Sequence, residues 1–180
     1  KNIYGGGNEA GITNSTSLII NGGNIASDIY GGGNYGTVGK DTTVLINDAT
    51  ILGSAYAGGN GSLANVKGNT SITVNGTTTI GSDTSKAPLS GSLFGGGNAA
   101  STGLESENNS TTVVNIAGAT IYGNVYGGAN TSTIYGKSNV YIGKNAILEN
   151  NTNLNYDSTN NAYTNNYSKI TFTDTFKSAT

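Results

Sequence analysis

Carboxylates are the main groups in this chain that could perform catalytic chemistry, because histidine, cysteine and arginine are all absent. Paired carboxylates can act as acid and base in the cleavage of glycosidic bonds. Glu105 and Glu107 form the only close pair, and it lies in the polar stretch Ser101–Ser110. The other acidic residues recur at no shared position of the sequence repeat. We therefore interpret Glu105 and Glu107 as a solvated pair in a loop, and the sequence predicts no catalytic residue.

Sites for metals, cofactors and nucleic acids are also disfavoured. A thiolate metal site needs cysteine, and the glycine runs lack the aspartates of calcium-binding repeats. All eight basic residues are lysines, spread thinly, and the formal net charge is −2. Without arginine, bidentate recognition of phosphate or guanine is lost. We expect no cofactor, no metal, no nucleic-acid partner and no membrane-spanning segment, since no run of about 18 apolar residues occurs.

A glycine-rich hexad recurs five times and organises the chain. Each copy reads apolar, aromatic, three small residues and asparagine. Its aromatic residues recur at intervals of 26, 26, 38 and 32 residues and are Tyr4, Tyr30, Tyr56, Phe94 and Tyr126. Its asparagines are Asn8, Asn34, Asn60, Asn98 and Asn130. A phosphate-binding glycine loop would need a following helix and usually a lysine, which are missing here. We therefore expect the glycines to provide positive φ angles or close packing between repeats.

The aromatic and asparagine positions are the two candidate sites of the repeat. Alternation along the residues before each hexad places Tyr30 and Tyr126 outward, which would give an exposed aromatic strip on which sugar rings could stack. The alternative, which we favour, is a stacked column that packs at a turn. For the asparagines, we favour a ladder of amides bonded from one repeat to the next over a polar binding groove.

A second pattern predicts β-strands between the hexads. An alternating trio such as Thr42, Val44 and Ile46 recurs in every repeat, and another isoleucine such as Ile51 follows it. Period-two alternation of β-branched residues is typical of strands. One repeat cannot bury its own apolar face, so successive repeats must stack. Stacking would form a core column of Leu18, Val44, Ile72, Val114 and Val140.

The predicted fold is all-β: a parallel β-helix solenoid of about five coils of roughly 26 residues. The usual chirality of parallel crossovers predicts a right-handed solenoid. The alternative is a β-roll or another solenoid with a different coil cross-section. Two loop insertions are expected, at Ser82–Ser92 and Ser101–Ser110. Threonines with the parity of the core are expected to bond at an inward corner, and they are Thr16, Thr42, Thr70 and Thr112. The outward positions are too irregular for ice binding.

The repeat domain is expected to cover residues 1–149. Residues 150–180 are predicted to form an irregular terminal coil or cap rich in Asn, Thr and Tyr, because the end units of solenoids are atypical. Within this tail, Ser168–Thr173 alternates and is expected to form a strand. The chain begins inside a repeat, which we interpret as a piece of a longer protein.

The hexads and trios, over about Lys1–Glu149, resemble the Gly/Asn/Thr-rich parallel β-helix regions of large bacterial surface proteins and adhesins. The resemblance implies a secreted or wall-attached stalk or adhesive module, extracellular or at the cell surface. Because the sequence predicts no catalytic residue, we expect a non-catalytic structural or adhesive segment. Its partners would be glycans, host or cell-surface proteins, or copies of itself joined end to end through open strand edges. The second hypothesis is a carbohydrate-binding module that uses the aromatic column and the two loops. A polysaccharide lyase or hydrolase is the third.

Overall fold

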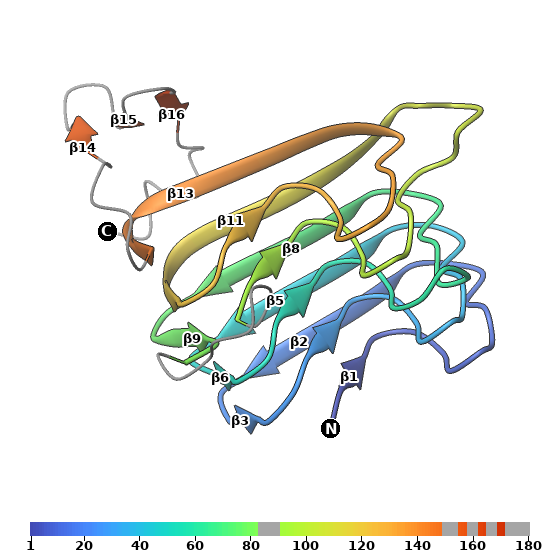
Figure 1. The fold of residues 1–180 in the computed structure, drawn as a ribbon, viewed down its shortest axis with the longest axis horizontal. Helices are drawn as coiled ribbons and strands as arrows, with labels where there is room; N and C mark the ends of the chain where they lie inside the picture. The colour runs from blue at the N-terminus through green and yellow to red at the C-terminus, as the bar shows by residue number, and fades with distance from the viewer. Residues whose placement is uncertain (83–90, 149–154, 158–161, 165–168, 172–180) are drawn as a thin grey trace.

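The computed structural model describes residues 1–82 and 91–148 and three short strands beyond them, with side chains described up to residue 143. In this part of the chain there is no helix, and the strands stack as successive coils of a parallel β-solenoid (Figure 1). The prediction of an all-β parallel solenoid of about five coils is therefore confirmed. The first predicted insertion, Ser82–Ser92, lies mostly outside the described residues.

Two sheets run along the solenoid. The hexads form a sheet in the order β1 (Ile3–Tyr4), β4 (Ile29–Tyr30), β7 (Ala55–Tyr56), β10 (Leu93–Phe94) and β12 (Val125–Tyr126). The trios form a second sheet of longer strands, which are β2 (Thr16–Asn21), β5 (Thr42–Asn47), β8 (Thr70–Asn75), β11 (Ser110–Ile121) and β13 (Gly136–Leu148). Three short strands stack beneath the far end of β11: β9 (Thr78–Ile80), β6 (Thr50–Ile51) and β3 (Asn24–Ile25).

The register between coils is the one that the repeat predicts. All strand pairs within the coils are parallel, and Leu18 pairs with Val44, which pairs with Ile72. Val114 and Val140 continue this column. A third line of contact between coils consists of single bridges that join Ile12, Val38, Val66, Thr102 and Ile134.

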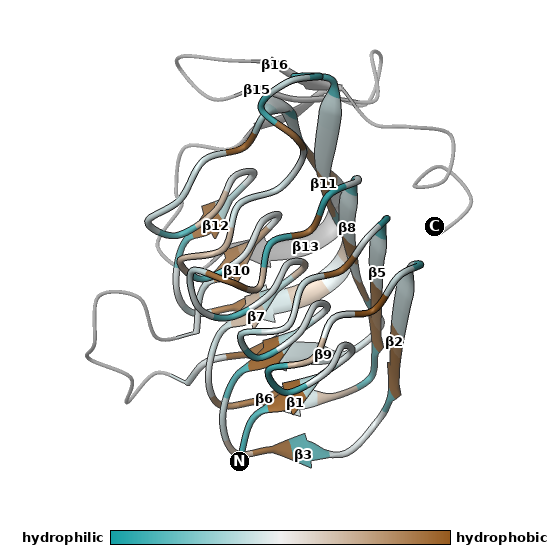
Figure 2. Ribbon diagram, turned by 90° about the vertical axis from the view of Figure 1, so that its right-hand side faces the viewer, coloured by the Kyte–Doolittle hydropathy of each residue, from teal (hydrophilic) through white to brown (hydrophobic). Residues whose placement is uncertain are grey.

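The core is divided into an aliphatic part and an aromatic part. Figure 2 shows the apolar strands stacked above one another from coil to coil. Core isoleucines of the middle coils are fully buried, whereas Ile20 and Ile25 of the first coil keep 8% and 9% of their surface exposed. Burying one such side chain contributes about 1.5–3 kcal/mol. Stacking therefore provides the stability that a single coil lacks.

The second insertion and the tail depart from the regular coil. Thr102 keeps its place in the bridge column, and the chain then makes an exposed turn in which Glu107 N and Asn108 N donate to Leu104 O at 3.1 and 2.9 Å. In the tail, β14 (Asn155–Asp157), β15 (Ala162–Thr164) and β16 (Lys169–Thr171) form an antiparallel sheet. β16 lies within the predicted strand Ser168–Thr173. The cap predicted for residues 150–180 lies largely outside the described residues.

Candidate functional site

The hexad aromatics form one continuous stack. Neighbouring ring centroids are 4.6–5.0 Å apart, and the rings are within 11° of parallel. Tyr30, Tyr56 and Phe94 are only 3%, 5% and 1% exposed, whereas Tyr126 at the last coil is 37% exposed. The outward strip expected from alternation is thus absent over the middle coils. The reason is local: each hexad strand has only two residues, and both are buried in β4, β7 and β10.

Burial changes the acidity of two phenols in this stack. It raises the pKa of Tyr56 from its ordinary value of 10.0 to about 12, and the negative charge of Asp28 adds to this effect. Burial raises the pKa of Tyr30 further, again with help from the nearby Asp28. The Tyr30 hydroxyl donates to Asp28 Oδ2 at 3.3 Å. Both phenols therefore stay protonated at neutral pH and contribute to packing and hydrogen bonding.

The hexad asparagines form a ladder of side-chain amides. In each step, the Nδ2 of one coil donates to the Oδ1 of the coil before it, at 2.7, 3.1, 2.9 and 3.0 Å from the first step to the last. The ladder residues are Asn8, Asn34, Asn60, Asn98 and Asn130. All donors point in the same direction, so interior members both donate and accept, while Asn8 and Asn130 each make one ladder bond.

Two more ladders join side chains to the backbone, and the sequence interpretation missed them. Two residues before each aromatic, a side-chain oxygen accepts from the backbone N–H of the same position in the next coil, at 2.8–3.2 Å, along Asn2, Asp28, Ser54, Ser92 and Asn124. The second ladder runs through Ser15, Asp41 and Asn69, each one residue before a long strand, and ends at the backbone N–H of Thr111 in β11, with distances of 2.7–3.3 Å. Asp28 and Asp41 are thus tied into contacts between coils.

The inward threonines and the hexad glycines also join neighbouring coils. Thr16 Oγ1 donates to Gly31 O at 2.6 Å and Thr42 Oγ1 to Ala57 O at 2.6 Å, with equivalent bonds from Thr70 and Thr112. No hexad glycine among the described residues has a positive φ. Instead, a Cβ on Gly32 would lie 2.8 Å from the backbone nitrogen of Gly59. Close packing, and not backbone conformation, explains these glycines.

The left-handed conformation lies one residue after each ladder asparagine. The φ angles at this position are 53–91°, and its occupants are Glu9, Tyr35, Gly61, Ala99 and Thr131. Only one of the five is glycine, although a left-handed residue with a side chain is disfavoured. The backbone of this corner therefore repeats in every coil, while its side chain varies.

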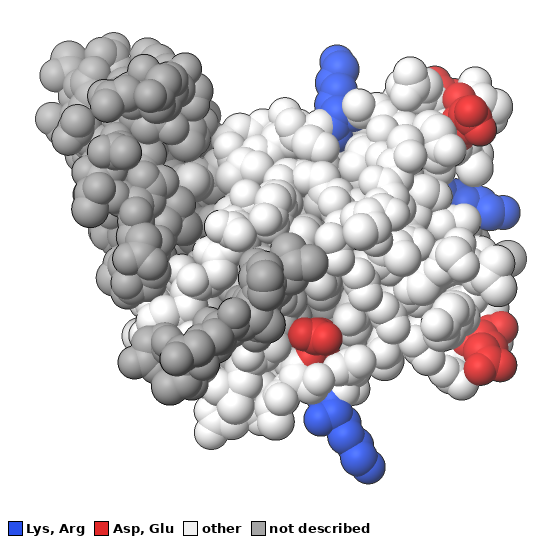
Figure 3. Space-filling view, in the orientation of Figure 1, with Lys and Arg blue, Asp and Glu red and all other residues white. Residues whose placement is uncertain are grey.

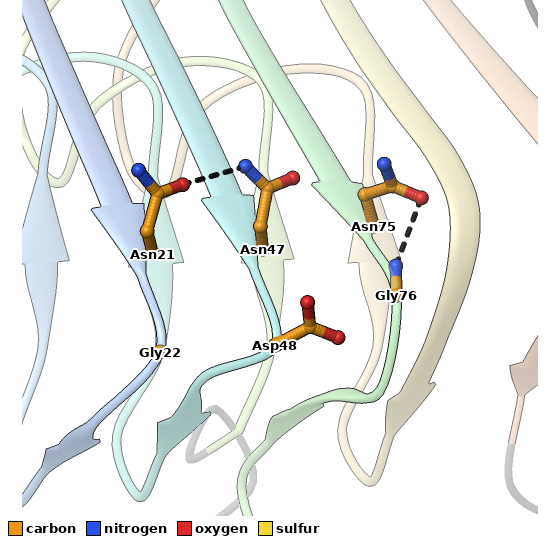
Figure 4. A pocket seen from close by; sticks show the side chains of 6 residues that line it. All are labelled: Asn21, Gly22, Asn47, Asp48, Asn75 and Gly76. Carbon is orange, nitrogen blue, oxygen red and sulfur yellow. Dashed lines mark hydrogen bonds between the residues drawn. The ribbon is translucent and has the colours of Figure 1, made fainter.

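A second corner follows the long strands and encloses a shallow hollow of about 490 Å³ (Figure 4). Asn47 Nδ2 donates to Asn21 Oδ1 at 2.8 Å, but Asn75 Oδ1 accepts from Gly76 N at 2.8 Å, so this short amide ladder ends there. The Asp48 carboxylate accepts from the Thr77 backbone at 2.9 Å. These groups bond among themselves, and we assign the hollow a structural role.

The charged groups do not converge on a catalytic or metal site within the described residues. Glu105 and Glu107 both lie on an exposed turn. Nowhere in the described part of the chain do three or more Asp or Glu side chains form a group that could hold a metal ion. Figure 3 shows isolated lysines and acidic residues on one face, with no patch of either sign. The same part of the chain contains no helix long and apolar enough to cross a membrane.

Comparison with protein-family models, with curated proteins and with solved structures gave no match. The interpretation of this chain therefore depends on its own repeat and geometry.

Proposed function

We propose that this chain is a non-catalytic structural and adhesive segment of a bacterial surface or secreted protein. The proposal rests on the hydrogen bonds that the polar side chains make between coils. Three ladders of Asn, Asp and Ser side chains and one set of inward threonines bond one coil to the next. Three carboxylates that an enzyme could use for acid–base chemistry, those of Asp28, Asp41 and Asp48, here accept hydrogen bonds from the backbone of the next coil, which favours a scaffold.

We further propose that copies of the chain associate end to end through the first coil. In the described part of this segment, β1, β2 and β3 each pair with a neighbouring strand on one side only. Their apolar side chains are less buried than their equivalents in the middle coils: Ile3, Tyr4 and Leu18 are each partly exposed. An open parallel edge with apolar side chains is a template for another strand. A second copy would cover this open edge with strands that pair in parallel, as the strands of neighbouring coils do within the chain.

Sedimentation velocity at rising protein concentration tests the association. The expected result is a concentration-dependent larger species that disappears in Leu18→Lys, which places a charge on the open end. The matched control is Ile19→Lys on the outward face of the same strand, where the native side chain is 58% exposed. A protein that stays monomeric over the whole range, or a species that survives Leu18→Lys, contradicts end-to-end association.

Location and lack of catalysis need separate tests. Protease treatment of intact producing cells should digest the segment if it lies at the surface, and protection from protease would contradict this location. Incubation with uronic-acid and neutral polysaccharides should release no fragments. Cleavage that is abolished by Glu105→Gln would instead establish the enzyme hypothesis.

A further inference from the structure

One aromatic side chain is largely exposed at a corner of the second coil. Tyr35 occupies the left-handed corner with a φ of 58°, yet its side chain is 48% exposed. A left-handed residue with a Cβ costs about 1–2 kcal/mol relative to a right-handed one. Other coils place Ala99 or Gly61 at the same position, so the solenoid does not need a large side chain there. The left-handed backbone belongs to the corner of every coil, so what is particular to Tyr35 is its large, exposed ring.

The neighbouring coil holds the Tyr35 ring in place. A Cβ on Gly61 would lie only 2.6–3.0 Å from ring atoms Cε1, Cδ1 and Cζ of Tyr35. The ring therefore lies directly against the backbone of the next coil, and only glycine at position 61 leaves room for it. Gly61 also has a φ of 91°, which suits glycine. The result is an aromatic ring that is fixed on one side and open to solvent elsewhere.

A local insertion places a second apolar group beside this ring. The segment between the ladder asparagine and the bridging valine is two residues longer in the third coil (Asn60–Val66) than in the second (Asn34–Val38). The additional residues form a turn in which Ala64 N donates to Gly61 O at 2.9 Å. Leu63 at this turn is 64% exposed. Together, Tyr35, Leu63 and Glu9 line a hollow of about 440 Å³.

We propose that this hollow of Tyr35, Leu63 and Glu9 binds a neutral pyranose sugar. The proposal deepens the adhesive role proposed above and depends on it, but it does not require self-association. The C–H face of a sugar ring is weakly positive and packs on the negative face of an aromatic ring. The Glu9 carboxylate can accept hydrogen bonds from sugar hydroxyls, and charged acceptors form the stronger bonds.

The lining favours a neutral sugar over other ligands. Among the described residues that line the hollow, the only charged group is the Glu9 carboxylate, which would repel phosphate, sulfate or a uronic acid. A hollow of this volume is large enough for a small molecule. Peptide anchors bind tightly in enclosed, desolvated pockets, whereas Tyr35 and Leu63 form an open platform. A stacked sugar needs only such a platform.

A glycan array that carries neutral and anionic sugars identifies the probe, and calorimetry with the free methyl glycoside of the best neutral sugar measures its affinity. We expect Tyr35→Gly to weaken binding at least tenfold, Leu63→Ser to weaken it less, and Tyr35→Phe to retain it. Tyr35→Gly also removes the backbone strain. Its urea midpoint should therefore not fall, which separates loss of binding from loss of folding.

Thr131→Gly is the matched control, because it makes the same backbone change at the same corner of the last coil. It should bind sugar as the wild type does. The proposal is overturned if no neutral glycan binds, if only anionic glycans bind, or if Tyr35→Gly binds as tightly as Thr131→Gly. Sedimentation of Tyr35→Gly should match the wild type, so loss of association and loss of sugar binding are distinguishable outcomes.

Discussion

Two adjacent positions at the end of each hexad behave in opposite ways. The sixth residue is asparagine in all five coils, and its amide bonds to the equivalent amide of the neighbouring coil. The next residue has the same left-handed backbone in all five coils but is Glu, Tyr, Gly, Ala or Thr. One position is fixed by contacts between coils, and the other is fixed only in its backbone. The corner can therefore change its exposed side chain without changing the solenoid.

The first test removes one asparagine from the interior of the amide ladder. Asn98→Ala deletes the donor to Asn60 and the acceptor for Asn130, which are 2.9 and 3.0 Å away. Each lost bond leaves a partly buried partner unpaired, so we expect a loss of about 2–3 kcal/mol in the free energy of unfolding. Urea denaturation followed by circular dichroism measures it.

Asn8→Ala is the control for this test. Asn8 lies at the exposed end of the ladder and makes only one ladder bond, at 2.7 Å to Asn34. The loss should be about 1 kcal/mol or less. Equal losses for Asn8→Ala and Asn98→Ala would show that the ladder does not stabilise the coil stack.

The aromatic column extends the comparison to pH. The pKa of Tyr56 is about 12 in the folded chain and 10.0 when unperturbed. Above about pH 10 the unfolded chain releases a phenolic proton that the folded chain retains, so the free energy of unfolding should fall as pH rises from 10 to 12. Tyr30, whose pKa is also raised by burial, acts in the same direction. The contribution of Tyr56 alone should be on the order of 2 kcal/mol, and that of Tyr30 adds to it.

Tyr56→Phe should make this alkaline decline shallower. A phenylalanine fits the column, because Phe94 already stacks on Tyr56 with centroids 4.6 Å apart. The comparison is between slopes of unfolding free energy against pH, measured by urea denaturation from pH 8 to 11.5. Identical slopes for the wild type and Tyr56→Phe would show that Tyr56 is not shielded in the folded chain.

One coil departs from the pattern within an otherwise apolar column. Thr102 replaces the Ile or Val of the bridge column and is fully buried, and its hydroxyl has no hydrogen-bond partner among the residues that the structure describes. Thr102→Val has nearly the same shape and removes this unpaired group. We expect the free energy of unfolding to rise by about 1–2 kcal/mol, measured by urea denaturation. A fall would show that the hydroxyl is paired in solution.

The repeat predicts most of the fold because stacking couples sequence period to register. Once Leu18, Val44 and Ile72 are aligned, each position of the repeat lies above the equivalent position of the neighbouring coil. Alternation could not predict the direction of the Tyr30 side chain. A two-residue strand at a corner is too short for alternation to determine which side chain points inward. The backbone ladders were missed because Asn, Asp and Ser look different in sequence but present the same acceptor oxygen.

The proposed sugar site consists of features that the repeat does not predict. The left-handed corner has no sequence signature, since Glu9, Tyr35 and Thr131 do not favour that conformation. The longer segment around Leu63 is visible in the sequence, but its meaning depends on which residue lies beside it in the coil below. Repeats identify what stays the same from coil to coil, whereas the candidate site consists of what differs.

The smallest expected effect tests the variable position by itself. Ala99 has a φ of 53° at the left-handed corner of the fourth coil. Ala99→Gly relieves the strain of a Cβ in this conformation, and the greater freedom of glycine in the unfolded chain offsets part of the gain. We expect the free energy of unfolding to rise by about 0.5 kcal/mol, resolved by replicate urea titrations. The control is Ala100→Gly at the next, buried position, where φ is not positive and the loss of a packed methyl should destabilise the fold. If both substitutions destabilise equally, the corner selects its side chain for packing, and the contrast between the two positions does not hold.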